Sequence, residues 1–354
     1  MRRLLLALTL SLVAGAAAAA QPLGAKPLAV GFYLPWDAAS RASTVAHAGA
    51  LDILAPMSAA LDSAAGTVRW QPDPALAAAL AAAKVKPRVF PVVSNAHDNV
   101  WDTAAADAAL TDPKAGDAFI AALAAQARAQ GYGGYILDLE TLSPRGAAAY
   151  PAFLTRLRDA LKPLGKELWV TATLSTDPAM LKQLADAADA VVLMAYDQCW
   201  ATGTPGPIAA QDWLEAMLDA KLAPKDGRAD PGRYVVALGA YGYDWPAGAP
   251  AQVVSAPQAA ELARAKGQAI AREAPAANPH FAYQGPGGDA HAVWYLDAAA
   301  FRTQRAAALA RHPRGVAIWR LGLEDPAIWA KTLPSAALGA TPATPRPACV
   351  ALPR

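Results

Sequence analysis

Cysteine and histidine are scarce in this sequence of 354 residues, which contains two cysteines and five histidines. Neither type recurs at the spacing of metal ligands, and this argues against a zinc site. We therefore expect no bound metal, and no motif indicates another cofactor. Cys199 and Cys349 pair only if the fold brings them together in an oxidising compartment, and the sequence leaves this disulfide open.

An excess of charge of one sign is also lacking. The chain has 31 Lys and Arg against 29 Asp and Glu, for a net charge of +2. This balance provides no strongly basic surface for a nucleic acid. No glycine-rich phosphate loop opens a helix after the first predicted strand, which argues against a dinucleotide-binding fold. We expect neither a nucleic acid nor a protein partner.

Long apolar runs are confined to the N-terminus. Arg2 and Arg3 precede an apolar stretch over residues 4–13, and residues 18–20 are alanines. This pattern is typical of a secretory signal peptide over residues 1–20, cleaved near Ala20. We expect a periplasmic or secreted mature protein without a membrane span. An uncleaved anchor is the alternative, although the apolar stretch is short for a span.

From residue 28 onward, short apolar runs alternate with alanine-rich helical segments, which is the pattern of βα units. The eight candidate strands lie at residues 28–33, 52–57, 86–93, 134–140, 167–173, 190–196, 233–241 and 314–320. Eight such units in one chain favour an α/β fold of the closed (β/α)8 type, a TIM barrel, over an open sheet.

The barrel is assigned to residues 27–333. One connection, at about residues 246–300, is longer than the others and contains three short β-rich runs. Its length predicts a small α+β insertion between strands seven and eight. Residues 334–354 are rich in proline and alanine, and we expect a loosely packed tail there.

The fourth predicted strand carries the strongest chemical signal. A glycine-rich turn at residues 131–134 leads into an apolar run that ends in Asp138 and Glu140. Side chains two residues apart share one face of a strand, so Ile136, Asp138 and Glu140 point the same way. Two acids in apolar surroundings raise each other's pKa, as catalytic acids require. The alternative for Glu140 is a cap on the following helix.

Acidic and aromatic residues also follow the other predicted strands, at the end where barrels of this kind hold their catalytic groups. The acidic and aromatic residues are Tyr33, Trp36, Tyr196, Asp197, Tyr241, Tyr243, Asp244, Trp245 and Trp319, and Met194 lies beside them at the end of the sixth strand. Aromatic rings stack on the apolar faces of a sugar and carboxylates accept hydrogen bonds from its hydroxyls, so the set favours a carbohydrate ligand. Rings at these positions can instead pack loops, and the same two interpretations apply to Trp101 and Trp213.

The acidic strand resembles the motif of glycoside hydrolase family 18, the chitinase-like barrels. That family carries Asp-x-x-Asp-x-Asp-x-Glu on strand four, and its four acidic positions align with Gly133, Ile136, Asp138 and Glu140. The last two acids match. Ile136 stands where the family has the second aspartate, which helps to control the charge of the third.

Two further motifs extend the resemblance over about residues 28–329. The strand-six pattern Met-x-Tyr-Asp is complete as Met194, Tyr196 and Asp197, and Trp319 is similar to the strand-eight tryptophan. Residues 291–297 resemble a segment of the bacterial, spore-germination-like branch of the family.

The resemblance implies a glycosidase that hydrolyses β-linked glycans containing N-acetylglucosamine: chitin-like oligomers, peptidoglycan or poly-N-acetylglucosamine. The signal peptide adds the expectation that this glycosidase is exported. In such retaining hydrolysis the substrate's own 2-acetamido oxygen attacks the anomeric carbon. Glu140 would act as general acid and then base, and Asp138 would orient and stabilise the acetamido group. Tyr196 and Asp197 would hydrogen-bond this group or the sugar beside it. Trp319 would form the floor of the subsite, and the other strand-end residues would bind substrate.

The substitution at Ile136 leaves a second function open. A non-catalytic, lectin-like barrel would keep the pocket and lose turnover.

Overall fold

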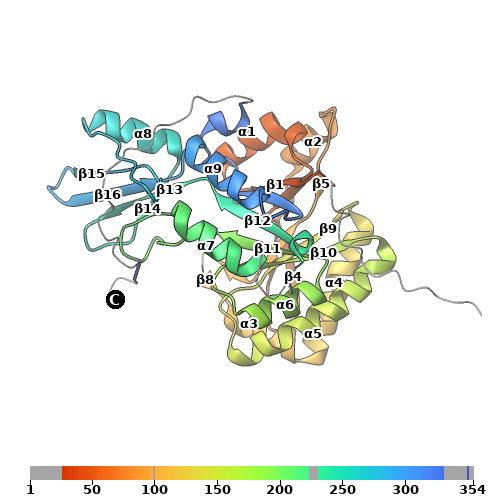
Figure 1. The fold of residues 1–354 in the computed structure, drawn as a ribbon. Helices are drawn as coiled ribbons and strands as arrows, with labels where there is room; N and C mark the ends of the chain where they lie inside the picture. The colour runs from red at the N-terminus through yellow and green to blue at the C-terminus, as the bar shows by residue number, and fades with distance from the viewer. Residues whose placement is uncertain (1–25, 99, 223–229, 331–348, 351–354) are drawn as a thin grey trace, which may run out of the picture.

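The computed structural model describes residues 26–98, 100–222, 230–330 and 349–350. Its centre is a parallel sheet with helices packed around it, and a smaller antiparallel sheet lies to one side, at the upper left of Figure 1. The predicted signal peptide at residues 1–20 and nearly all of the predicted tail lie outside the described residues. None of the helices in the described part of the chain is long and apolar enough to cross a membrane.

Parallel strands occur at every position where the sequence predicts one. They are β1 (Leu28–Tyr33), β2 (Ile53–Pro56), β5 (Arg88–Val89), β6 (Val92–Ser94), β9 (Gly134–Asp138), β10 (Glu167–Thr173), β11 (Ala190–Ala195), β12 (Tyr234–Gly239) and β17 (Gly315–Trp319). Two short segments extend the sheet: β3 (Ala59–Leu61), and β4 (Val68–Trp70), which is antiparallel to β3.

The third predicted strand is divided into β5 and β6. The two halves pair with the strands on either side, and together they close the barrel. β5 pairs with β2, whereas β6 pairs with both β3 and β9. Pro91 lies in the gap and has no N–H to donate to a ladder. Its carbonyl still accepts from Ile136 N at 3.1 Å, and Phe90 N donates to Leu54 O at 2.9 Å. With β17 bonded to β1, the eight strand positions form a closed ring, and the predicted (β/α)8 barrel is confirmed.

Alternate side chains on each strand fill two separate cores, as the two-residue period of a strand requires. Ile136 points into the barrel with Phe90 and Trp169, all of them fully buried. Its neighbours Tyr135 and Leu137 point outward and are covered by the helices.

The helices around the barrel are α1 (Ala38–His47), α2 (Pro74–Ala82), α3 (Thr103–Thr111), α4 (Pro113–Ala129), α5 (Pro144–Leu161), α6 (Pro178–Ala187), α7 (Gln211–Leu222) and α9 (Ala298–Leu309). Short 3-10 turns lie at Ala48–Ala50, Lys162–Leu164, Pro231–Arg233 and Pro326–Trp329. Aspartate side chains cap the first turns of α1, α2, α3, α4, α6 and α9, often with proline at the next position. These caps set where each helix begins.

The predicted insertion is present between β12 and β17. It contains β13 (Gly242–Pro246), β14 (Gln252–Val254), α8 (Ala256–Ala265), β15 (His280–Gln284) and β16 (Ala290–Tyr295). The strands form an antiparallel sheet in the order β14-β13-β16-β15, and α8 covers it. We call this part the lobe. It begins at Gly242, where a side chain would collide with Tyr295.

Several strand ends differ from the prediction. The fourth barrel strand was expected to include Glu140, but β9 stops at Asp138. The seventh differs most. The seventh barrel strand was expected to reach Tyr241, with Tyr243, Asp244 and Trp245 at its end, but β12 stops at Gly239. These three residues lie on β13, because the chain turns there and pairs antiparallel with β16 instead of continuing in the barrel.

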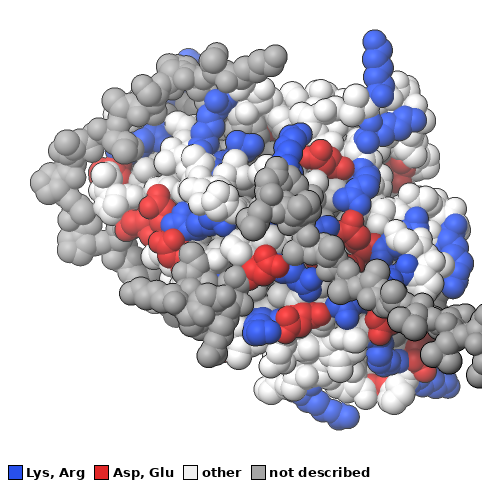
Figure 2. All heavy atoms as spheres, turned by 45° about the vertical axis from the view of Figure 1, so that its right-hand side comes forward, with Lys and Arg blue, Asp and Glu red and all other residues white. Residues whose placement is uncertain are grey.

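Cys199 and Cys349 form a disulfide with a Cα–Cα distance of 5.1 Å, which answers the question that the sequence leaves open. The bridge ties the C-terminal segment to the loop after β11, next to Tyr241 and Trp245. On the face drawn in Figure 2, basic and acidic side chains of the described residues are mixed.

Candidate active site

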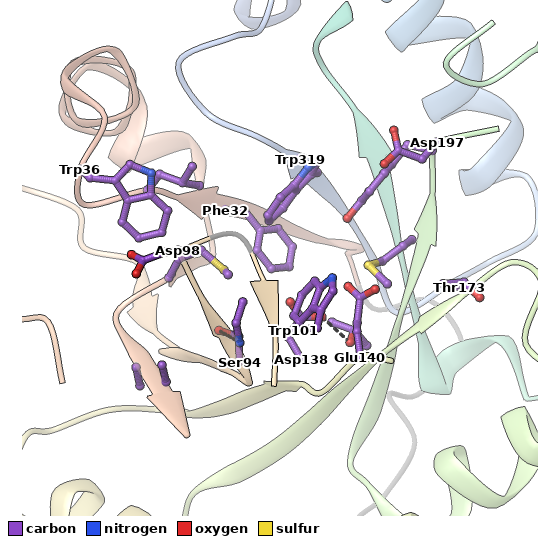
Figure 3. Close-up of a pocket in the computed structure, with 18 of the residues that line it drawn as sticks. Phe32, Trp36, Ser94, Asp98, Trp101, Asp138, Glu140, Thr173, Asp197 and Trp319 are labelled. Carbon is purple, nitrogen blue, oxygen red and sulfur yellow. Dashed lines mark hydrogen bonds between the residues drawn. The ribbon is translucent and has the colours of Figure 1, made fainter. Parts of the chain in front are cut away.

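A cavity of about 850 Å³ opens at the C-terminal ends of the barrel strands. Its wall includes Phe32, Trp36, Met57, Arg69, Ser94, Asp98, Trp101, Asp138, Glu140, Thr171, Thr173, Met194, Tyr196, Asp197, Trp213 and Trp319. In Figure 3, Trp36 and Asp98 lie at one end, Asp197 and Thr173 at the other, and Trp101, Glu140 and Trp319 between them. Among the described residues, no group of His, Cys, Asp and Glu is arranged to hold a metal ion.

Asp138 ends β9 and is almost completely buried, with 6% of its surface exposed. Thr171, on the neighbouring β10, donates a hydrogen bond to its Oδ1 at 2.7 Å. Burial raises the pKa of Asp138, and the bond from Thr171 opposes this rise because it stabilises the ionised form.

Glu140 lies two residues beyond Asp138, in the turn that follows β9. Its backbone N–H donates to Asn95 Oδ1 at 2.9 Å, and Asn95 Nδ2 donates back to the Glu140 carbonyl at 3.0 Å. Burial first, and then the charges of Asp138 and Asp197, raise the pKa of the Glu140 carboxyl to about 8. Glu140 is therefore a carboxylic acid that still carries its proton at neutral pH, as a general acid must.

Asp197 follows β11 on the opposite side of the cavity. Tyr241 and Tyr243 both donate to its Oδ1, the bond from Tyr243 measuring 3.1 Å. The backbone of Asp197 is left-handed, with φ at 55°, which is uncommon for a residue with a side chain and costs about 1–3 kcal/mol. The two tyrosine bonds hold this conformation. Burial raises the pKa of Asp197, against the effect of both bonds.

Tyr196 stands beside these acids, and burial together with the charges of Asp138, Asp197 and Glu140 keeps its pKa well above the ordinary value. It is a neutral phenol that can donate a hydrogen bond. Its ring stacks on Trp319, with centroids 5.9 Å apart and planes at 11°. Phe32 supports Trp319 from the side at 5.4 Å, so the tryptophan forms a fixed flat wall.

Trp36 is the exposed ring of the site, with 65% of its surface exposed. An open tryptophan at the rim provides an apolar platform for a second part of a long ligand. Trp101 and Trp213, for which the sequence left two interpretations, also line the cavity.

The structure gathers seven of the expected site residues at this cavity: Trp36, Asp138, Glu140, Met194, Tyr196, Asp197 and Trp319. Tyr241 and Tyr243 do not line it and act on it through Asp197.

Three of the expected contacts need correction. Tyr33 points outward from β1 and donates to Asp73, with no exposed surface. Asp244 bonds to Tyr283 and His291 within the lobe, and Trp245 is buried in the packing between lobe and barrel. Each side chain is already occupied by protein partners outside the cavity.

Asn95 and Thr171 are absent from the sequence-based set. Neither belongs to an acidic or aromatic pattern. Asn95 binds the backbone of Glu140 and Thr171 binds the carboxylate of Asp138, and only the folded barrel brings these residues together.

Comparison with known proteins assigns the fold to a family. The family model described as "Glycosyl hydrolases family 18" matches residues 30–324. The chain belongs to this family. The predicted resemblance to glycoside hydrolase family 18 is thereby confirmed, and the matched residues include the lobe and every residue of the cavity.

Two similar curated proteins come from Bacillus subtilis (strain 168). The "Cortical fragment-lytic enzyme" of Bacillus subtilis (strain 168) is 27% identical over 217 residues, which are 57% of this chain and 49% of that protein. This chain therefore spans about half the length of that relative. The "Uncharacterized glycosylase YvbX" of the same strain is 25% identical over 261 residues, 70% of this chain and 75% of that protein.

Two solved structures share the fold. A chitinase from Chromobacterium violaceum ATCC 12472 superposes with a TM-score of 0.76 at 24% identity, covering 86% of this chain and 97% of that one. The spore cortex-lytic enzyme SleL of Bacillus megaterium QM B1551 gives 0.76 at 21% identity, covering 86% and 72%.

Proposed function

We propose that this chain is a glycosidase that hydrolyses β-linked glycans containing N-acetylglucosamine by a substrate-assisted, retaining mechanism. The observation that carries the proposal is Glu140, a carboxyl group with a pKa of about 8 in a sugar-sized cavity with aromatic walls. Asp138 beside it matches the third acid of the strand-four motif, and the Tyr196 and Asp197 pair across the cavity matches the strand-six motif.

In the first step, Glu140 donates its proton to the oxygen of the bond that breaks. The acetamido oxygen of the substrate attacks the anomeric carbon, so that no enzyme nucleophile is needed. Asp138, ionised, accepts a hydrogen bond from the acetamido N–H and stabilises the positive charge that develops. Tyr196 donates to the acetamido oxygen or the sugar beside it.

In the second step, the Glu140 carboxylate removes a proton from water, which opens the cyclic intermediate with retention of configuration. Trp319 is packed between Phe32 and Tyr196 and supports the apolar face of the reacting sugar.

The substrate class rests on the acetamido requirement and on what the relatives are named for. A cortical fragment-lytic enzyme and chitinases both stand among the similar proteins. Chitin-like oligomers, peptidoglycan strands and poly-N-acetylglucosamine all present the required group, and we include all three in the proposal.

We further propose that the mature protein acts in the periplasm or outside the cell, after cleavage near Ala20. The basic and apolar pattern of residues 1–20 supports export. The disulfide between Cys199 and Cys349 supports an oxidising compartment.

The test is mass spectrometry of products after incubation with the three substrates. Wild type should cleave at least one, and Glu140→Gln should cleave none while it still binds. Glu261→Gln, an exposed glutamate that pairs with Arg264 on α8, is the matched control and should behave as wild type.

The second candidate function is a lectin-like sugar-binding barrel, favoured by Ile136 in place of the family's second aspartate. Binding of all three glycans by wild type without any cleavage would establish it and overturn the proposed hydrolysis.

A further inference from the structure

In the part of the barrel that the structure describes, Asp138 has no acidic partner below it. Ile136 occupies that position, fully buried against Phe90 and Trp169, and it can neither share a proton with Asp138 nor donate a hydrogen bond. A side chain that holds Asp138 between turnovers must therefore come from another strand.

The other groups around Asp138 come from four elements. Ser94 on β6 is its register partner, but the Ser94 hydroxyl lies near Ala96 N. Tyr150 on α5 is buried nearby, and its pKa is raised by burial and by the charge of Asp138. Glu140 and the Tyr196 and Asp197 pair face it from the cavity. Among the described residues, Thr171 is the one side chain with a hydrogen bond to the Asp138 carboxylate.

The position of Thr171 follows from the strand register. β10 pairs with β9 so that Val170 lies opposite Leu137, and Thr171 is consequently level with Asp138. Its hydroxyl has one hydrogen and two acceptors in reach: Asp138 Oδ1 at 2.7 Å and the Leu137 carbonyl at 3.4 Å. The closer acceptor holds the hydrogen in this structure.

We propose that Thr171 is a positioning residue that takes the place of the missing second aspartate, holding ionised Asp138 away from Glu140 and releasing it when substrate binds. This inference rests on the proposed function. When Asp138 turns toward the acetamido group, the Thr171 hydroxyl turns to the Leu137 carbonyl. No buried donor is left without a partner, so the release carries little penalty.

Thr171 differs from a carboxylate in one chemical respect. A threonine hydroxyl cannot hold or supply a proton at neutral pH, whereas a second aspartate can share one. The single proton of the Asp138 and Glu140 pair therefore stays on Glu140, where the leaving oxygen needs it. Loss of the hydroxyl destabilises ionised Asp138 and moves the proton toward the wrong carboxyl group.

The experiment compares Thr171→Val, which keeps the shape and removes the hydroxyl, with Thr171→Ser, which keeps the hydroxyl. Thr155→Val is the matched control, because Thr155 on α5 donates to the Pro151 carbonyl at 3.1 Å away from the cavity. We measure kcat and KM against pH on the glycan that wild type cleaves, and the folding of each variant by circular dichroism. Thr171→Ala replaces the valine variant if the latter does not fold.

We expect Thr171→Val to lower kcat about tenfold to a hundredfold, the usual effect of one hydrogen bond to a charged group, with little change in KM. In the pH profile of kcat, the fall on the acid side should move to higher pH, because Asp138 takes up a proton at a higher pH. The fall on the alkaline side, which Glu140 sets, should stay in place. Thr171→Ser should restore both kcat and the position of the acid-side fall, and Thr155→Val should match wild type.

Three results overturn the inference. If wild type cleaves glycans and Thr171→Val retains its kcat and its acid limb, Thr171 has no positioning role and the proposed function stands. If both Thr171 variants lose activity with an unchanged acid limb, the role of Thr171 is structural. If wild type cleaves nothing, the proposed function fails and this inference fails with it.

Discussion

Asn95 binds the backbone of Glu140 in both directions, as acceptor from its N–H and as donor to its carbonyl. Asn95 is completely buried and also donates to the Asp102 carbonyl at 3.1 Å. One amide side chain thus fixes the turn that carries the catalytic acid. Asn278 makes the same set of bonds elsewhere: it accepts from Ala209 N and donates to the carbonyls of Ala209 and Ala276.

The two asparagines make a controlled pair for mutation. Asn95→Leu leaves the Glu140 N–H and carbonyl without their partner, whereas the Asp102 carbonyl keeps its bond from Ala106 N. Asn278→Leu leaves the Ala209 N–H without its partner, because Gln304 still donates to the Ala209 carbonyl and Gln211 N still donates to the Ala276 carbonyl. Each buried group left unpaired costs about 1–3 kcal/mol. Both should lower Tm in thermal unfolding, and Asn95→Leu should lower it by the larger amount. Asn95→Leu alone should also lower kcat of the folded fraction, about a hundredfold, because Glu140 shifts from its position. Equal kcat in the two folded variants would contradict a role for Asn95 in placing Glu140.

Asn95 also shows why the sequence predicts only part of this site. Asp138 ends β9 and Glu140 follows only two residues later, so their closeness along the chain is enough to place them together. Asn95 reaches Glu140 from 45 positions away, and Thr171 reaches Asp138 from 33. Their partners depend on which strands become neighbours and in which register, and local sequence patterns do not contain this information.

The lobe shows the same limit at the level of the fold. Apolar runs predicted both the seventh strand and the insertion, but the run through Tyr243 to Trp245 fits either one. Antiparallel pairing of β13 with β16 decides between them, and it moves Asp244 to Tyr283 and His291. The predicted strand end was therefore too long, although the order of the elements was correct.

The pH dependence of hydrolysis should reflect the acid pair. The active form has Glu140 protonated and Asp138 ionised, and the pKa of Glu140 is about 8. Activity should therefore persist through neutral pH and fall as pH rises through about 8. It should also fall on the acid side as Asp138 takes up a proton. A profile of kcat/KM between pH 4 and pH 10 would measure both limbs, and activity unchanged from about pH 7 to pH 10 would contradict Glu140 as the acid.

The same raised pKa has a cost for stability. In the unfolded chain Glu140 ionises near the ordinary glutamate pKa of 4.5, whereas in the folded protein its raised pKa keeps it protonated to about pH 8. The folded state therefore binds the extra proton in this window, and stability falls as pH rises through it.

Glu140→Gln should remove this cost. Its Tm should equal that of wild type near pH 4.5 and exceed it by a margin that grows up to about pH 8 and then stays constant. Differential scanning fluorimetry at several pH values would measure the margin. Glu261→Gln serves as control and should show no such trend, and a margin that shrinks with pH would contradict the burial of a protonated Glu140.

Trp36 should matter for long substrates only. Its exposed ring lies at the far end of the cavity from Asp197 in Figure 3. Loss of one stacked sugar is worth about 1 kcal/mol, or roughly fivefold in affinity. Trp36→Ala should raise KM for longer oligomers by about that factor and leave the shortest cleaved oligomer unchanged. Val85→Ala, a distant exposed apolar residue, is the control. An equal rise in KM at all lengths would show that Trp36 contacts no separate sugar.

The disulfide between Cys199 and Cys349 joins residues 150 positions apart, so it restricts much of the unfolded chain. It also packs against the aromatic series that runs from Trp319 through Tyr196 and Tyr241 to the lobe. Such a bridge stabilises a protein by about 2–5 kcal/mol, and for a chain of this length reduction should lower Tm by roughly 3–7 °C. Cys349→Ser should lower Tm by the same amount, and the Tm of this variant should not respond to dithiothreitol.

The loss of the bridge should also affect activity. Because the bond from Tyr241 to Asp197 depends on the same packing, kcat should decrease near the new Tm before the barrel unfolds. Thermal scans with and without reductant, followed by activity at each temperature, would measure both effects. Equal Tm values for oxidised and reduced protein would show that the bridge contributes nothing to the stability of the barrel.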